Sequence, residues 1–259
     1  MVTLRIRKAL VASAALVLSA GTGLALLPAT GAVALAGSSA SQAAVASSAT
    51  VRPASLGTAS YAFSSVLDGK PVRWNPCAPI LWTSNTTRGP AGGLAVLTSS
   101  VARIAALTGT TWKYVGATTR VPTAGYLPKA ASATYPPVLI GWADATSSDL
   151  LRGQAKGVLA MTRTSWFGVQ TPAGAKIAAT RAAVVALDRT DVLPLRGGTS
   201  WNAVVLHELG HAMGLAHTGD ARQLMATLLP RTVADLQAGD KAGLVKLGRT
   251  PGCVTVPAM

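Results

Sequence analysis

The residues best suited to chemistry in this chain lie together in one short stretch. All three histidines and the only glutamate fall within eleven residues, at His207, Glu208, His211 and His217. Three imidazoles can fill three corners of a tetrahedral zinc site and leave the fourth open for water. A carboxylate beside that water can take its proton. The residue types therefore predict a hydrolytic zinc site, with the three histidines as ligands and Glu208 as general base.

The spacing of these residues fits a helix that ends between the second and third histidines. On a helix, His207 and His211 lie on one face, about 6 Å apart along the axis, and Glu208 is turned about 100° from His207. Gly214 is predicted to end the helix, because glycine adopts a left-handed conformation without steric cost. The turn at Gly214 would bring His217 back to the same ion, whereas a continuous helix would point it away.

The sequence around this cluster resembles the metzincin metallopeptidases, and within them the bacterial secreted matrixin-like proteins. The string HELGHAMGLAH over residues 207–217 is similar to their extended zinc signature, in which three histidines bind zinc and the glutamate is general base. Met225 lies eight residues past the third histidine, where the family has its Met-turn beneath the metal. Segments 72–77 and 236–240 also look similar, so the resemblance covers roughly residues 61–253. It implies a zinc endopeptidase with one catalytic Zn²⁺ and protein or peptide substrates.

Alternatives to this interpretation come from the same residues. A short HExxH string also occurs by chance on exposed helices, and Met225 could simply fill the core. A non-catalytic zinc-binding exported domain would lack a base, yet Glu208 is present. A zinc hydrolase that cleaves a non-peptide amide of the cell wall would use the same activated water. The site residues do not separate this last alternative from a peptidase.

Further metal sites have weaker support in the sequence. Every histidine lies in the cluster, so no second histidine-built zinc site is expected. Calcium is an alternative that would rest on isolated aspartates, at Asp144, Asp149, Asp188 or Asp191. Aspartates of this kind in turns are more often solvated or act as caps.

The elements that must position the cluster predict an α/β fold of the α+β zincin-like kind. Apolar and β-branched runs predict strands at residues 79–84, 110–115, 138–142, 157–166 and 176–187. The last two are expected to form a hairpin, although abundant alanine leaves a short helix open at 176–187. This order indicates a mixed, mostly parallel twisted sheet with one antiparallel edge strand.

Helical spacing predicts three helices that pack on this sheet. The first covers residues 92–107 and ends at Gly109, and the active-site helix is capped by Thr199 or Ser200. A C-terminal helix is expected at residues 232–247, because Thr232 and Asp235 resemble a capping box.

The first residues of the chain are predicted to direct export. A basic start at residues 5–8 and an apolar stretch at 9–27 precede the small-residue pattern Ala34-Leu35-Ala36, so residues 1–36 resemble a signal peptide. An uncleaved membrane anchor is the alternative. The Ser/Ala-rich residues 37–60 are expected to be a linker or short pro-segment, followed by one catalytic domain over 61–259. The protein is therefore expected to be secreted.

The charge of the chain says little about a macromolecular partner. Its net charge is +14, but the basic residues are scattered singly, without aromatic residues between them. This pattern does not indicate nucleic-acid binding and favours a solvated basic surface. Weak electrostatic attraction to anionic cell-wall polymers is an alternative. We expect a monomer.

The two cysteines, Cys77 and Cys253, are predicted to form a disulfide, because an even pair in an exported protein is typically oxidised. The alternative is a cysteine that caps the zinc and keeps the enzyme latent. Neither cysteine lies in a segment ahead of the domain, which favours the bridge.

Overall fold

The computed structural model describes residues 33–43, 60–129, 134–170 and 174–256 of this chain. Three helices accompany its strands, at α1 (Gly93–Thr108), α2 (Trp201–Met213) and α3 (Ala238–Leu247). The main strands are β1 (Val33–Ala43), β5 (Ile80–Asn85), β6 (Trp112–Ala117), β7 (Val138–Ala143), β8 (Ala160–Gln170) and β9 (Lys176–Asp188). Shorter elements are β2 (Ala62–Phe63), β3 (Val66–Leu67), β4 (Lys70–Pro71), β10 (Leu215–Ala216) and the 3-10 helix η1 (Ala124–Tyr126).

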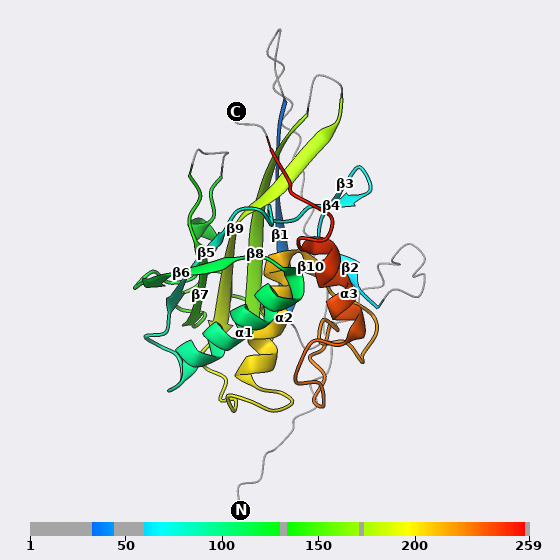
Figure 1. The fold of residues 1–259 in the computed structure, drawn as a ribbon. Helices are drawn as coiled ribbons and strands as arrows, with labels where there is room; N and C mark the ends of the chain where they lie inside the picture. Colours follow the sequence, from blue (N-terminus) through cyan, green and yellow to red (C-terminus); the bar gives the residue numbers. More distant parts are fainter. Residues whose placement is uncertain (1–32, 44–59, 130–133, 171–173, 257–259) are drawn as a thin grey trace, which may run out of the picture.

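The sheet has the order β1-β8-β9-β7-β5-β6 (Figure 1). Strands β6, β5, β7 and β9 run parallel to one another, whereas β8 is antiparallel to β9 and β1 is antiparallel to β8. The predicted mixed, mostly parallel sheet is therefore confirmed. The expected hairpin at residues 157–187 is confirmed as β8 and β9, and the helical alternative for 176–187 is wrong.

Two apolar layers lie on opposite faces of this sheet, as the alternation of β9 illustrates. Val185 packs in the core shared with α1 and α2, whereas its neighbour Val184 packs against Leu150 and Leu151 on the other face. Helices α1 and α2 lie on the same face of the sheet (Figure 1). The other face is covered by the loops that precede β7 and β8.

The C-terminal helix begins later than predicted. The capping box at Thr232 and Asp235 is wrong, because the Asp235 carboxylate is engaged elsewhere: it accepts a 2.8 Å bond from Arg103 on α1. Helix α3 instead starts after Gln237, whose backbone N–H donates to Asp240 at 2.8 Å. Asp240 thus plays the capping role that the sequence had assigned five residues earlier, to Asp235.

Strand β1 extends the sheet beyond the predicted edge. Its backbone pairs with all of β8, from Val33 opposite Gln170 to Ala43 opposite Ala160. The predicted cleavage point after Ala36 falls within this strand. Most of the predicted signal peptide and linker, residues 1–32 and 44–59, lies outside the described residues, so both stay predictions. In the part of the chain that the structure describes, no helix has the length and apolar character to cross a membrane.

The two ends of the domain are fastened to each other. Cys77 and Cys253 are joined in a disulfide with their Cα atoms 5.5 Å apart, so the predicted bridge is present. Arg73, which is 7% exposed, donates to the carbonyl oxygens of Gly248 and Gly252 at 3.0 and 2.8 Å. The segment before β5 and the segment after α3 are therefore held together by one covalent bond and by a buried guanidinium.

Candidate metal centre

Helix α2 carries the first two histidines through the middle of the protein. Ser200 caps it, accepting a hydrogen bond from the backbone N–H of Ala203 at 3.3 Å, as the sequence predicted for Thr199 or Ser200. All of its residues except Asn202 are buried. The Trp74 indole donates to the Ala212 carbonyl at 2.8 Å and secures the last turn. The helix is thus a fixed platform for side chains at 207, 208 and 211.

The chain turns sharply at the end of α2, as the glycine in the sequence indicated. Gly214 has φ 118°, and its N–H donates to the carbonyls of Gly210 and His211 at 3.2 and 2.9 Å. A Cβ at this position would lie 3.1 Å from the carbonyl oxygen of Val72. Beyond the turn, β10 pairs with β2 and leads to His217. The backbone therefore needs glycine here, both for its conformation and for space.

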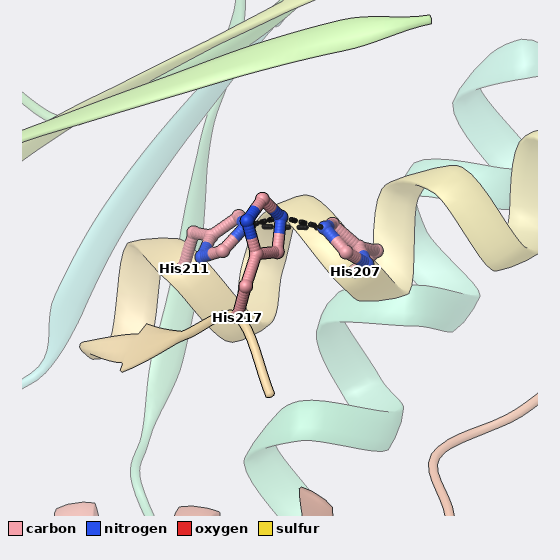
Figure 2. A group of neighbouring side chains, drawn as sticks. All are labelled: His207, His211 and His217. Carbon is pink, nitrogen blue, oxygen red and sulfur yellow. Dashed lines mark hydrogen bonds between the residues drawn. The ribbon is translucent and has the colours of Figure 1, made fainter. Parts of the chain in front are cut away.

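The three histidines meet at their Nε2 atoms (Figure 2). Nε2 of His207 lies 3.1 Å from that of His211 and 3.1 Å from that of His217, and the remaining pair is 3.2 Å apart. Two imidazoles rise from α2 and the third from the segment after it. The structure thus brings together the three predicted metal ligands.

Backbone carbonyls fix which ring nitrogen carries the proton. Nδ1 of His207 lies 2.7 Å from the Leu224 carbonyl, and Nδ1 of His211 lies 2.8 Å from the Leu215 carbonyl. Because a carbonyl can only accept, both Nδ1 atoms must donate, which leaves both Nε2 atoms with lone pairs. Two lone pairs 3.1 Å apart repel each other, so the arrangement calls for a cation between them.

The distances fit zinc. Ligands at the usual Zn–N distance of 2.0–2.1 Å and at tetrahedral angles are separated by about 3.3–3.4 Å, close to the observed 3.1–3.2 Å. Three histidine nitrogens are also one of the donor sets of catalytic zinc sites, in which water takes the fourth position. Within the described parts of the chain, this is the one group of three potential metal-binding side chains.

Burial keeps the imidazoles in the form that binds metal. Desolvation and, to a smaller extent, the nearby His217 lower the pKa of His207 to about 3. Desolvation also lowers the pKa of His217 to about 4, and that of His211 lies well below its usual value for the same reason. The rings therefore remain neutral over the physiological range, so a metal need not displace protons from them.

Glu208 directly follows His207 on α2 and is fully buried, at 0% exposed. Its Oε2 accepts a hydrogen bond from the Thr162 hydroxyl at 2.6 Å, while its Oε1 has no partner. Burial raises the pKa of Glu208 to about 8, and the bond from Thr162 works against that shift. A buried carboxylate oxygen without a partner is costly unless a ligand satisfies it, which again fits a site completed by a metal and water.

Met225 lies directly beneath α2. A Cβ at Gly210 would lie 2.5 Å from the Met225 sulfur, so the side chain fills the space that glycine leaves on the underside of the helix. The N–H of Thr218 donates to the Met225 carbonyl at 2.9 Å, which ties the segment after the third histidine to this turn. Met225 thus packs against the active-site helix, and its Met-turn role stays a prediction.

Asp240 anchors the Met225 turn, a role that the sequence analysis did not assign. Its carboxylate accepts from the backbone N–H groups of Leu224 and Met225 at 2.8 and 3.2 Å, in addition to that of Gln237. The Leu224 carbonyl in turn accepts from His207. A short chain of hydrogen bonds therefore links α3 to the imidazole of His207, one of the three predicted ligands, as expected of groups that orient metal ligands.

Replacing Asp240 tests this anchor. In Asp240→Ala, two buried N–H groups and a half-buried one lose their acceptor, and we expect the free energy of unfolding to fall by about 3 kcal/mol. Urea titration measures the loss, and zinc affinity should fall with it. Asp68→Asn, on an exposed carboxylate 3.8 Å from Lys176, is the control and should change stability little. An Asp240→Ala protein as stable as the wild type would contradict the anchoring role.

The aspartates considered for calcium serve other contacts. Asp144 accepts from Arg189 and Arg88 at 2.6 and 3.2 Å, and bonds from Thr146 and Ser147 help to hold its pKa well below the usual range. Asp149 accepts from the Ala124 N–H at 2.8 Å. Asp188 accepts from Thr190, and Asp191 follows in the same turn. Capping and ion pairing thus account for three of the four carboxylates.

Comparison with known proteins agrees with this geometry. The model of the matrixin family, of the M10 peptidase class, matches residues 123–247, a range that holds β7, β8, β9, α2, the three histidines and all of α3. No curated protein matches the chain. The three clustered histidines also fit the HExxHxxGxxH zinc site of a metzincin.

Proposed function

Because residues 123–247 match the model of the matrixin family of metallopeptidases, we propose that the protein is a secreted zinc endopeptidase. The observation that carries the proposal is the convergence of three Nε2 atoms within 3.1–3.2 Å of one another, next to a buried glutamate. His207, His211 and His217 would hold the zinc. Glu208 would act as general base, and Met225 would form the floor of the site.

Each group of the site has its own role in the proposed reaction. When bound, zinc would lower the pKa of its water ligand toward about 7 and polarise the scissile carbonyl. Glu208 takes a proton from the water as its oxygen attacks the carbonyl carbon, and then delivers that proton to the departing amine as the C–N bond breaks. The carbonyls of Leu224 and Leu215 hold two of the imidazoles in the tautomer and orientation that this requires.

Export and surface charge complete the proposal. The Cys77–Cys253 disulfide is compatible with an extracellular protein, where such bonds persist. The net charge of +14 would favour weak attraction to anionic wall polymers, which binding at low and high salt would reveal. We expect the protein to act as a monomer on protein or peptide substrates.

Digestion of casein by the purified secreted protein tests the proposed activity. We expect cleavage that a zinc chelator abolishes and that added zinc restores. Parallel digestion of cell-wall fragments, with and without chelator, separates a peptidase from a hydrolase of non-peptide amides. Stoichiometric zinc without cleavage of any protein substrate would point instead to a non-catalytic zinc-binding domain.

A further inference from the structure

Thr162 contacts the glutamate of the site from a different part of the fold. Thr162 lies on β8, 46 residues before Glu208, and its hydroxyl is 2.6 Å from Glu208 Oε2 and 3.2 Å from the Glu208 carbonyl oxygen. Both side chains are buried, at 1% and 0% exposed. In the ionised form, which a general base requires, the carboxylate only accepts, so the hydroxyl donates to Oε2. In that form this is a short hydrogen bond to a charged acceptor, the stronger kind.

The hydroxyl belongs to a rigid part of the sheet. Thr162 pairs with Val185 of β9 on one side and with Ser41 of β1 on the other, so its backbone is fixed in a ladder on both sides. A threonine side chain is also restricted in χ1. The backbone that carries the hydroxyl is therefore fixed by the sheet, whereas Glu208 is carried by α2.

The two oxygens of Glu208 are not equivalent as a result. Oε2 is held by Thr162, whereas Oε1 is buried without a protein partner. From this geometry we infer that Thr162 is a positioning residue: its hydroxyl fixes the rotation of the Glu208 carboxylate and leaves Oε1 to receive the proton from water. The inference rests on the proposed function, because it concerns the base of that reaction.

If the Thr162 hydroxyl needed only some hydrogen-bond acceptor, a backbone carbonyl would be enough and no carboxylate would be required. The Glu208 carbonyl is within reach at 3.2 Å, yet the shorter contact is to the side chain, at 2.6 Å. Thr164 provides the comparison on the same strand. It is also buried, at 6% exposed, and pairs with Ala183 two positions along β9, but its hydroxyl makes no bond to Glu208. The two threonines thus differ in whether their hydroxyl contacts Glu208.

Kinetic analysis of Thr162→Val, with Thr164→Val as matched control, tests the inference. Valine keeps the shape and removes the donor. We expect Thr162→Val to lower kcat by about 10- to 100-fold while KM changes less than about twofold, because a small misplacement of a reacting group costs this much. Thr162→Ser should restore most of kcat, and Thr164→Val should behave like the wild type. Bound zinc is measured in every variant and should stay the same.

The single glutamate of the chain permits a second measurement that needs no activity. Protein labelled with ¹³C at the glutamate carboxyl carbon reports Glu208 alone, since the sequence contains no other glutamate. We expect the carboxylate infrared band and its ¹³C resonance to move in Thr162→Val and to stay near the wild-type values in Thr162→Ser and Thr164→Val. If the valine variant does not fold, Thr162→Ala removes the same hydroxyl with a smaller side chain and is measured in its place.

The outcomes separate the inference from the proposed function. An active wild type with a folded Thr162→Val variant of equal kcat, or with an unmoved carboxylate signal, overturns the positioning role alone. A wild type that binds zinc and cleaves no peptide overturns the proposed function, and with it this role, whatever the carboxylate signal does.

Discussion

Glu208→Gln is expected to keep its zinc and lose peptide hydrolysis by about 10²- to 10⁴-fold, the usual contribution of a general base. Glutamine has the same shape, and its amide oxygen can still accept the hydrogen bond from Thr162. The amide cannot take a proton from water. The three imidazoles are untouched. The measurement is kcat/KM on a peptide substrate together with zinc content. The variant Asp68→Asn makes the same chemical change on an exposed carboxylate and should retain full activity.

Stability measurements show whether such a loss reflects chemistry or unfolding. Burial raises the pKa of Glu208 from 4.5 to about 8, so without metal the folded protein binds a proton between these values that the unfolded chain has released. The contribution of Glu208 to stability is therefore complete below pH 4.5 and is lost as pH rises toward 8. Glutamine does not titrate. Metal-free Glu208→Gln should thus lose less stability than the wild type over this range, and full activity in this variant would refute Glu208 as base.

His211→Ala is expected to lose zinc and, with it, all hydrolysis. Two imidazoles remain, and changes to groups that merely orient a ligand already cost 10- to 100-fold in metal affinity, so we expect more than about 100-fold weaker binding. The wild type should gain about 4 kcal/mol of stability when free zinc exceeds its dissociation constant by about 1,000-fold. His211→Ala should show almost none of this gain.

Metal analysis after dialysis and thermal unfolding with and without zinc measure both effects. Asn202→Ala, on the same helix but at its first turn, is the control and should keep zinc and its stabilisation. A His211→Ala protein that retains one zinc per chain would contradict the ligand assignment.

The sequence predicted those parts of the fold that local patterns determine. The run from Val138 is apolar throughout and reads as a buried strand without any tertiary information. Ser200 and Gly214 could be assigned to the two ends of α2 because a cap and a left-handed turn each favour particular residue types. The histidine spacing then placed three ligands on a helix and its following turn. In each case the determining interactions lie within a few residues.

What the sequence did not predict depends on residues far apart in the chain. Asp235 resembles a helix cap in the sequence, but in the fold its carboxylate accepts a hydrogen bond from Arg103 of α1. Asp240 caps the helix instead, and its carboxylate also accepts from two N–H groups of the turn at Leu224. The contact between Thr162 and Glu208 joins a strand to a helix, and no spacing of neighbouring residues in the sequence indicates it. One signal was available in principle: a polar residue at an inward position of an otherwise buried strand needs a partner.

Pairing between distant strands was equally hidden. Residues 33–43 are rich in serine and alanine, a composition that gives no hydrophobic alternation, yet their backbone groups complete the hydrogen-bond ladder of β8. A free strand edge can recruit a segment through its backbone alone, with little demand on the side chains. The composition of such a segment is therefore a poor guide to whether it joins a sheet.

The disulfide makes residues 77–253 a closed covalent ring, and every proposed zinc ligand lies inside it. Any protein that cuts peptides is exposed to cuts by its own copies, and the loop that precedes α2 offers a target, with Val192 96% exposed. One cut there would leave two polypeptides that are joined by the disulfide, rather than two separate pieces. Both halves of the core would stay attached, and the histidines on one side of the nick would remain tethered to the sheet on the other. Such nicked molecules would migrate as intact protein until a reductant released the fragments.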